Sequence, residues 1–166
     1  MERAFEFRIL GEVEWFGLGP EESYPDMRSA AFVGRHRRQM GDLIAPQVRP
    51  QEAGHRSDVR ELVLSAPGIR ERLRIRRIEG DLGFTLRPWS PAEVTSAEHP
   101  HELPPPSRTH LILDLAMHGL GSRSCGPDVR PEHQLRPRPL EVTLEVVTSR
   151  VHLGEMYQRA VIRAPI

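Results

Sequence analysis

The sequence predicts an all-β protein, folded as an antiparallel β-sandwich with one short helix. Several short segments alternate apolar and polar residues, which is the period of a half-buried strand. The 16 prolines and 13 glycines recur between these segments and indicate stiff turns. Only one segment carries the signals of a helix. Short strands that follow one another through turns favour a sandwich over a mixed α/β architecture.

The expected strands begin near the N-terminus and continue to the last third of the chain. FEFRI at residues 5–9 places its three apolar residues on one face, opposite a glutamate and an arginine. LEVTLEV at residues 140–146 shows the clearest alternation. Further strands are expected over residues 59–64, 72–76, 82–86 and 111–115. The alternating arginines of residues 72–76 indicate a solvated strand face, which explains them better than nucleic-acid binding.

The segment around Trp15 is expected to end a strand and enter a turn. Trp15 and Phe16 follow Val13, so one of the two aromatic rings is expected in the core rather than as a platform for a sugar. GLGP at residues 17–20 indicates a tight turn. It is not a phosphate-binding loop, because neither a helix start nor a Lys-Ser/Thr pair follows it.

The helix is expected to begin at SPAE, residues 90–93. Serine and glutamate at this spacing form a capping box, and proline suits the first helical position. His99 and Pro100 then end the helix, because the residue before a proline disfavours helical conformation.

Composition limits the class of protein. The 166 residues amount to one domain, long enough to bury roughly two-thirds of the surface of the unfolded chain. The 23 basic residues, all arginine, balance 23 acidic residues, so no net charge attracts the chain to nucleic acid or to an anionic membrane.

The cysteine content and the N-terminus favour a soluble cytoplasmic protein. Cys125 is the single cysteine, which excludes an intrachain disulfide. The first residues show neither the basic-then-apolar pattern nor the cleavage site of a signal peptide. No apolar run approaches the roughly 20 residues that cross a bilayer. The sequence leaves the oligomeric state, including a homo-oligomer, open.

Four segments in a fixed order are the most informative part of the chain. They read EWFGLGPEESYPD at 14–26, VRPQEAGHRSDVREL at 48–62, SAEHPHELPPPSRTHLILD at 96–114 and GLGSRSCGPDV at 119–129. Together they resemble the C-terminal β-sandwich domain, the small-chain domain, of glycoside hydrolase family-two β-galactosidases. The resemblance covers roughly residues 12–148.

The resemblance implies a galactose-mutarotase-like supersandwich that is incomplete in this chain. In the family the domain is much longer, and the WFGxGPxESYPD motif lies near its middle. We therefore expect a C-terminal fragment, or one half of a divided domain. Residues 1–148 are assigned to the sandwich, and residues 149–166 to a divergent C-terminal tail.

The resemblance also implies a role in hydrolysis of terminal non-reducing β-D-galactose residues, such as that of lactose. Retaining glycosidases use two carboxylates, and in this family both belong to a (β/α)₈ barrel in another domain. We therefore expect no catalytic residue here and no activity from this chain alone. The catalytic barrel domain, or large chain, is the expected partner, and the galactoside is expected to bind through that complex. The family's Mg and Na ions bind other domains, so no cofactor is expected here.

One loop of the domain reaches over the barrel mouth in the family. In some members its tryptophan offers a flat face on which the sugar next to galactose can stack. Cys125 takes that position here, and the loop is similar to a second version, GLGTxSCGPD. The resemblance thus places Ser124, Cys125 and Gly126 near the acceptor subsite, without the stacking ring.

The remaining motif residues are expected to be structural. They are Glu21, Tyr24, Asp26, Glu52, Arg56, Arg60 and Asp128. Glu52, Arg56 and Arg60 predict a partly buried ion-pair network that fixes a loop. Glu22 and Glu102, like Glu21 and Glu52, are carboxylates of the type that cleaves glycosides, but each lies in a loop that the family uses structurally.

Two further chemical interpretations are weaker. Cys125 as a nucleophile requires a histidine and a depressed thiol pKa, and His118 is a histidine nearby in sequence. His99 and His101 have a metal-like spacing, but they flank a proline and would not converge on a zinc ion. No metal site is expected.

Two other functions remain open. A non-catalytic carbohydrate-binding or assembly module would have the same architecture, since fold does not imply function. A mutarotase-like isomerase would need a base and an acid on the concave face, and the His/Glu pattern of that family is absent from the sequence.

Overall fold

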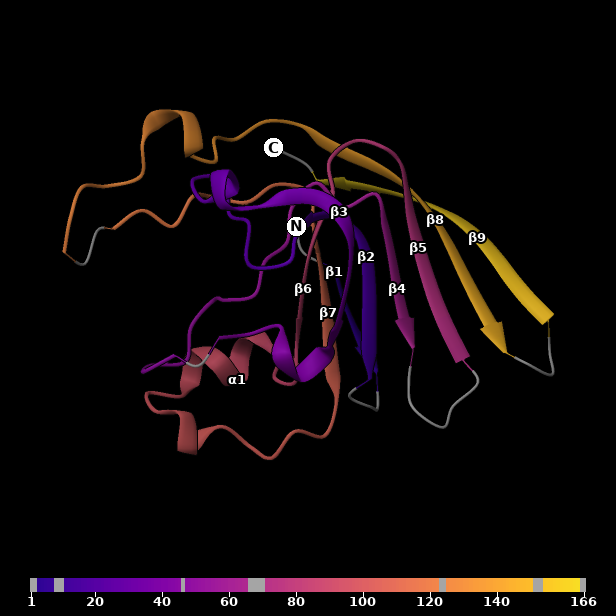
Figure 1. Ribbon diagram of the computed structural model, residues 1–166, viewed down its shortest axis with the longest axis horizontal. Helices are drawn as coiled ribbons and strands as arrows, with labels where there is room; N and C mark the ends of the chain where they lie inside the picture. The colour runs from indigo at the N-terminus through magenta and orange to yellow at the C-terminus, as the bar shows by residue number, and fades with distance from the viewer. Residues whose placement is uncertain are drawn as a thin grey trace.

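The computed structural model describes residues 3–7, 11–45, 47–65, 71–122, 125–150 and 154–164. Over these residues the strands form two antiparallel sheets, one of six strands and one of three. Figure 1 shows the larger sheet as a fan, with the smaller sheet at its β2 end and the long loops gathered at one side. The chain is an antiparallel all-β sandwich, as the sequence predicted.

The six-stranded sheet has the order β3-β2-β4-β5-β8-β9. Its strands are β2 (Glu12–Gly19), β3 (Phe32–Gln39), β4 (Glu61–Ser65), β5 (Glu71–Glu79), β8 (Leu140–Arg150) and β9 (Gly154–Ala164). Residues of one face pair across neighbouring strands, as Val13 does with Leu64 and Trp15 with Leu62. This face is apolar because side chains alternate along each strand.

The three-stranded sheet has the order β1-β7-β6. Its strands are β1 (Arg3–Phe7), β6 (Gly83–Arg87) and β7 (Thr109–Asp114). Every residue of β6 is buried, and so are the first five of β7. A bridge between Arg56 and Phe84 extends this sheet toward the motif loop that precedes β4.

The core lies between the two sheets. The Trp15 ring of the larger sheet meets the Phe84 ring of the smaller one edge-on, with centroids 5.7 Å apart. Leucines of β4, β6, β7 and β8 belong to the same cluster, together with valines and isoleucines of the larger sheet. Burial of each such side chain contributes roughly 1.5–3 kcal/mol, so the interface between the sheets is the main source of stability. Of the two aromatic residues at 15 and 16, Trp15 is the one in the core, and Phe16 is only partly buried.

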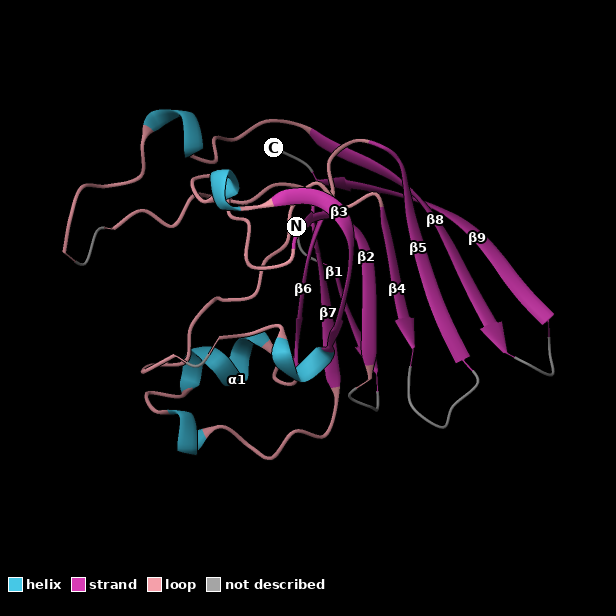
Figure 2. Ribbon diagram, in the orientation of Figure 1, coloured by secondary structure: helices cyan, strands magenta, loops and turns pink. Residues whose placement is uncertain are grey.

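Helical turns lie only in the loops, as Figure 2 shows. Helix α1 spans Pro91–Ser96, and Ser90 and Glu93 form the predicted capping box. The 3-10 turns are η1 (Arg28–Ala30), η2 (Met40–Asp42), η3 (Pro100–Glu102) and η4 (Pro131–His133). Among the described residues, none of these helices is long and apolar enough to cross a membrane.

The alternating segments predicted as strands correspond to β1, β4, β5, β6, β7 and β8. Ile9, assigned to the first strand, lies outside the described residues. Strand β3 was not predicted, because FVGRHRRQ is an exposed edge strand in which only His36 is buried. The prediction for residues 17–20 needs correction, since Gly17 and Gly19 belong to β2. A side chain at Gly17 would approach the carbonyl oxygen of Asp58 to 2.7 Å, which explains the glycine.

Residues 149–166, which the sequence assigned to a divergent tail, include strand β9. Strand β9 pairs with β8 over eleven residues, from Leu140 with Ala164 to Arg150 with Gly154. The sequence did not reveal it, because arginine and glutamine alternate with small and apolar residues on both of its faces. The sheet therefore continues beyond the region of resemblance.

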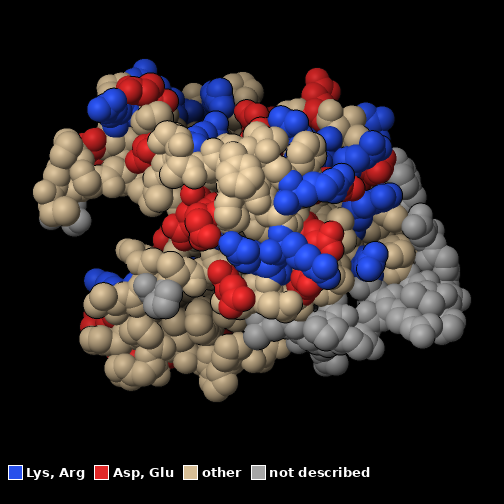
Figure 3. Space-filling view, viewed as in Figure 1, with Lys and Arg blue, Asp and Glu red and all other residues tan. Residues whose placement is uncertain are grey.

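The outer surface mixes both signs of charge, and Figure 3 shows arginine and acidic side chains interspersed on one face. The arginines of β5 at 72, 74 and 76 are exposed, as predicted. Arg76 donates two hydrogen bonds to Glu145 on the neighbouring strand, at 2.6 and 3.1 Å. This face has no single-sign field of the kind that attracts nucleic acid.

Candidate functional site

The site begins where the first and last motif segments meet. The Asp26 carboxylate accepts hydrogen bonds from the backbone N–H groups of Leu120, at 3.1 Å, and Gly121, at 2.7 Å. Asp26 is close to the surface and only partly buried. This pair of bonds attaches the loop of residues 119–129, hereafter the tethered loop, to the end of the EESYPD motif.

These bonds also act on the charge of Asp26. Partial burial raises the pKa of its carboxyl, but the amides of Gly121 and Leu120 outweigh this effect and hold the pKa below its ordinary value of 3.8. The carboxylate is therefore the bound form near neutral pH, and it holds the tethered loop in place.

The tethered loop is also closed on itself. The N–H groups of Cys125 and Gly126 both donate to the Ser122 carbonyl, at 2.9 and 2.6 Å. The Ser122 hydroxyl donates to the Pro127 carbonyl at 3.1 Å. A side chain at Gly126 would lie 2.5 Å from that hydroxyl, so it would displace the Ser122 side chain from this position. Cys125 and Gly126 are exposed at the loop tip, and Ser124 lies outside the described residues.

Arg56 holds the second motif segment from inside the protein. It is 1% exposed, and its guanidinium donates to the carbonyls of Leu43, at 2.6 Å, and Gly54, at 2.8 Å. A third bond runs to the Pro20 carbonyl at 3.3 Å. The cation also lies 5.8 Å from the centre of the Trp15 ring. Burial lowers the pKa of Arg56, and the charges of Glu22 and Glu21 oppose this change.

The ion-pair network predicted for Glu52, Arg56 and Arg60 does not form. Glu52 pairs with Arg87 at 3.2 Å and accepts a long hydrogen bond from the Tyr24 hydroxyl. Arg60 turns instead to Asp58, at 3.5 Å. The reason is that Arg56 lies too deep for a carboxylate, and backbone carbonyls accept from its two terminal nitrogens, Nη1 and Nη2, while Nε has no partner.

Tyr24 packs deep between the two loops and is 1% exposed. Its ring lies 5.4 Å from the His55 ring. Burial, followed by the charges of Glu52 and Glu22, raises the pKa of Tyr24, so the phenol stays neutral. Glu22 in turn accepts a hydrogen bond of 2.6 Å from the N–H of Gly54.

The other singled-out residues have local partners. Exposed Glu21 pairs with Arg38 at 3.4 Å. Glu102 accepts from the N–H groups of Glu98 and His99, at 2.8 and 3.4 Å. Asp128 accepts from the N–H of the next residue at 2.7 Å. These contacts fix loops, so the carboxylates at 21, 22, 52 and 102 each have a structural partner.

The histidines considered for catalysis or metal binding also have identifiable contacts in the structure. His118 Nδ1 lies 2.7 Å from the Gly119 carbonyl oxygen, to which it donates. The rings of His99 and His101 stack at 5.4 Å, and His99 contacts Glu102 at 3.1 Å. No group of three or more metal-ligating side chains occurs in the described part of the chain.

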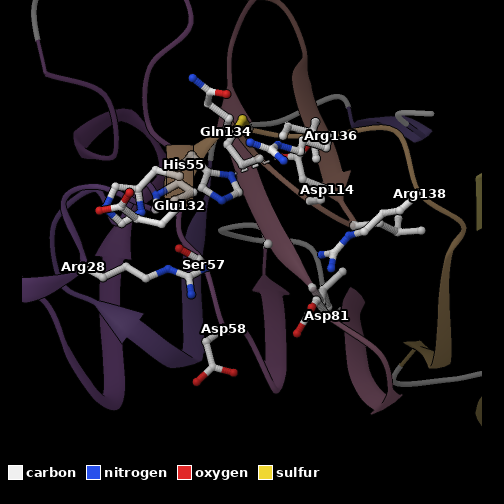
Figure 4. Close-up of a pocket in the computed structure, with 18 of the residues that line it drawn as sticks. Arg28, His55, Ser57, Asp58, Asp81, Asp114, Glu132, Gln134, Arg136 and Arg138 are labelled. Atoms are coloured by element: carbon white, nitrogen blue, oxygen red, sulfur yellow. Dashed lines mark hydrogen bonds and ion pairs between the residues drawn. The ribbon is translucent and has the colours of Figure 1, made fainter. Parts of the chain in front are cut away.

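Sequence reasoning missed a pair beside these loops, in which a buried histidine contacts a partly buried aspartate. His55 Nδ1 lies 3.1 Å from Asp114 Oδ2, and His55 is 2% exposed. Both residues border a cavity of about 780 Å³, shown in Figure 4. The only signal in the sequence was an aspartate that directly follows the apolar run of β7.

Comparison with known proteins identifies the family of this chain. Residues 7–147 match the family described as beta galactosidase small chain. The chain belongs to this family. A β-galactosidase of Arthrobacter sp. (strain B7) is 46% identical over 135 residues, which cover 80% of this chain and 13% of that protein.

Other members give the same result. Beta-galactosidase 2 of Enterobacter cloacae is 35% identical over 133 residues, which cover 80% of this chain and 12% of that protein. A β-galactosidase of Vibrio cholerae is 35% identical over 140 residues, 82% of this chain and 13% of that protein. The chain thus corresponds to a small part of these relatives, and the resemblance found in its motifs is confirmed.

Proposed function

We propose that this chain is the C-terminal sandwich part of a β-galactosidase that hydrolyses terminal non-reducing β-D-galactose residues. Its role is to pack against the catalytic barrel and to shape the acceptor side of the active site. The match over residues 7–147 to the small-chain family carries this proposal. The partial coverage of the relatives supports a division of labour in which catalysis belongs to the rest of the enzyme.

The tethered loop is the part proposed to approach the substrate. Its tip carries Cys125 and Gly126 on the surface, while Asp26 fixes its base. A loop that is exposed at the tip and fixed at the base can line a neighbouring site without collapsing into its own domain. The small thiol side chain leaves space there for the acceptor sugar or for another aglycone.

The chain alone is expected not to hydrolyse a chromogenic β-galactoside, because it contributes no catalytic carboxylate. The assay compares the purified chain, free of host β-galactosidase, with a buffer blank. Turnover clearly above the blank would overturn this part of the proposal.

The acceptor role is tested in a chimaera in which residues 7–147 replace the matching part of the Arthrobacter enzyme. Cys125→Trp in the chimaera is expected to strengthen inhibition by glucose by about two- to tenfold, since a ring adds a stacking surface. Inhibition by galactose should change little. Val48→Trp, on a side chain that is 94% exposed in another loop, is the matched control. Equal shifts for both sugars, or no shift, would place the loop away from the acceptor subsite.

A non-catalytic carbohydrate-binding or assembly module is the second candidate. The chimaera separates it from the first, because such a module would not restore turnover when it replaces the matching part of the enzyme.

A further inference from the structure

The cavity beside the tethered loop has the features of a binding site that the proposed function does not use. Its volume of about 780 Å³ falls in the range of small-ligand sites. The ends of β6 and β7 form one wall, and the segments around Arg28 and residues 131–138 form the rim. Figure 4 shows side chains from these separate parts of the chain facing one hollow.

Packing fixes the position of the His55 ring at the base of this cavity. The Tyr24 ring packs on it at 5.4 Å, and Gly83 lies against its edge. A side chain at Gly83 would lie 2.3 Å from Cε1 and 2.8 Å from Nε2 of His55. The ring therefore occupies space that only glycine leaves free.

The contact with Asp114 determines what His55 offers to a ligand. Because Nδ1 donates to the carboxylate, at 3.1 Å, the other ring nitrogen, Nε2, is left for a ligand and is an acceptor when the ring carries a single proton. Nε2 has no hydrogen-bond partner among the described residues, and it is not closed off from solvent. A buried, oriented and unpartnered acceptor that borders a cavity is suited to a ligand hydroxyl.

The rim adds donors and acceptors that are also free. Arg28, Arg136 and Arg138 line the cavity, and none of the three has an ion-pair partner in the described parts of the chain. Asp81 also lines the cavity and has no hydrogen-bond or ion-pair partner in those parts of the chain. A guanidinium can donate to two neighbouring hydroxyls at once, and a carboxylate can accept from two.

The arrangement favours a neutral polyol over a phosphate. Figure 4 shows Arg28 and Arg138 on opposite sides of the hollow, with Asp114 and Asp81 also facing it. A compact anion requires cations that converge on one point, away from carboxylates. Leu82 and Leu115 supply apolar surface at the base, which matches the C–H face of a sugar ring.

We propose that this cavity binds a neutral polyhydroxylated ligand of monosaccharide size, with His55 and Asp114 at its centre and the rim arginines as donors. Binding in this cavity is a function separate from the proposed role of the tethered loop at the acceptor subsite. It can be tested on the 166-residue chain without any catalytic partner, so failure of one proposal leaves the other standing.

Methionine methyl groups provide reporters for the test. Met117 lines the cavity, Met40 lines a different, apolar hollow, and Met156 is exposed on β9. In the chain labelled with ¹³C at its methionine methyls, titration with D-galactose or D-glucose is expected to shift the Met117 signal in a saturable way. The Met40 and Met156 signals should stay in place.

Two variants test the assigned groups. His55→Leu is expected to weaken binding about tenfold or more, through loss of the central acceptor. Arg138→Gln, on the exposed rim, is expected to weaken binding about threefold without any risk to folding. Arg72→Gln, on the outer face of β5, is the matched control and should bind as the unchanged chain does. Unmoved Met40 and Met156 signals show that each variant is folded.

Three results would overturn the proposal. The first is a Met117 signal that neither sugar shifts at high millimolar concentration. The second is a shift produced by inorganic phosphate and not by sugar, which would make the cavity an anion site. The third is sugar binding that both His55→Leu and Arg138→Gln leave unchanged.

Discussion

Arg56 and Asp26 perform the same task in different surroundings. Each is a charged side chain that binds backbone groups of loops distant in sequence. Arg56 is buried and donates to carbonyls of three segments, whereas Asp26 lies near solvent and accepts from two N–H groups of one loop. The comparison separates what holds the fold from what positions the loop.

Burial explains why we expect the loss of Arg56 to destabilise the protein more than the loss of Asp26. When a buried partner is removed, the carbonyls it served lose their hydrogen bonds and water cannot replace them. At the surface, water takes over the released N–H groups at little cost. The protein should therefore unfold more easily without Arg56. Loss of Asp26 should free the tethered loop and leave the rest of the fold intact.

Arg56→Met gives the largest expected effect. The substitution keeps much of the side-chain volume but leaves three carbonyls without their donor. We expect the free energy of unfolding to fall by about 3–5 kcal/mol. Urea denaturation, followed by the fluorescence of the two tryptophans, Trp15 and Trp89, measures the change.

Arg38→Met is the matched control for this prediction. Arg38 is an exposed arginine with one ion pair, to Glu21 at 3.4 Å. Its loss should cost about 0.5 kcal/mol or less. If the two variants lose equal stability, burial is not what distinguishes Arg56.

Asp26→Ala should act locally. It removes both acceptors of the tethered loop, and we expect the opening free energy of that loop to fall by about 1–2 kcal/mol. Hydrogen exchange at the amides of Leu120 and Gly121 measures the opening, and global unfolding should shift by less.

Asp26→Asn is the accompanying variant. Its amide oxygen can still accept one bond, so the effect should be about half as large. Exchange at Leu120 and Gly121 that is unchanged in both variants would show that other contacts position the loop.

Acidification should break the hydrogen bonds between Asp26 and the tethered loop but not the hydrogen bonds of Arg56. The folded-state pKa of Asp26 lies below the ordinary value of 3.8, so its contribution is complete above 3.8 and disappears as pH falls through the folded-state pKa. The Arg56 guanidinium stays protonated throughout this range. The amide proton of Gly121 should move upfield during acidification, with a midpoint below 3.8. A midpoint above 3.8 would contradict the tether.

Tyr24→Phe should have the smallest effect. The hydroxyl makes one hydrogen bond of 3.4 Å, and Glu52 keeps Arg87 as a partner when the hydroxyl is removed. We expect a loss of about 0.5 kcal/mol in the free energy of unfolding. A loss as large as that of Arg56→Met would mean that the phenol, rather than the guanidinium, joins the motif loops.

The sequence predicted the strands that alternate, because alternation is the direct result of one buried face. It did not predict β3 and β9, the two edge strands of the larger sheet, which carry exposed arginines and few buried side chains. The capping box of α1 depends on residues three apart, so it was visible in the sequence.

The contacts of the site were harder to predict. The sequence assigned Asp26 a structural role without naming a partner, and only the fold shows its carboxylate on the amides of Leu120 and Gly121. The partner of Glu52 was predicted wrongly, because Arg87 lies on β6 and no local spacing indicates it. His55 and Asp114 are 59 residues apart, and only the alignment of β7 with the second motif segment brings them together.

Cys125 is the single cysteine of the chain and is exposed at the tip of the tethered loop. A thiol-specific dye therefore labels one position only, and that position is next to the surface proposed to meet the barrel. Fluorescence anisotropy of the labelled protein would report the local motion of the loop. Energy transfer to a second dye on a candidate partner would report docking, without any engineered label site in this chain.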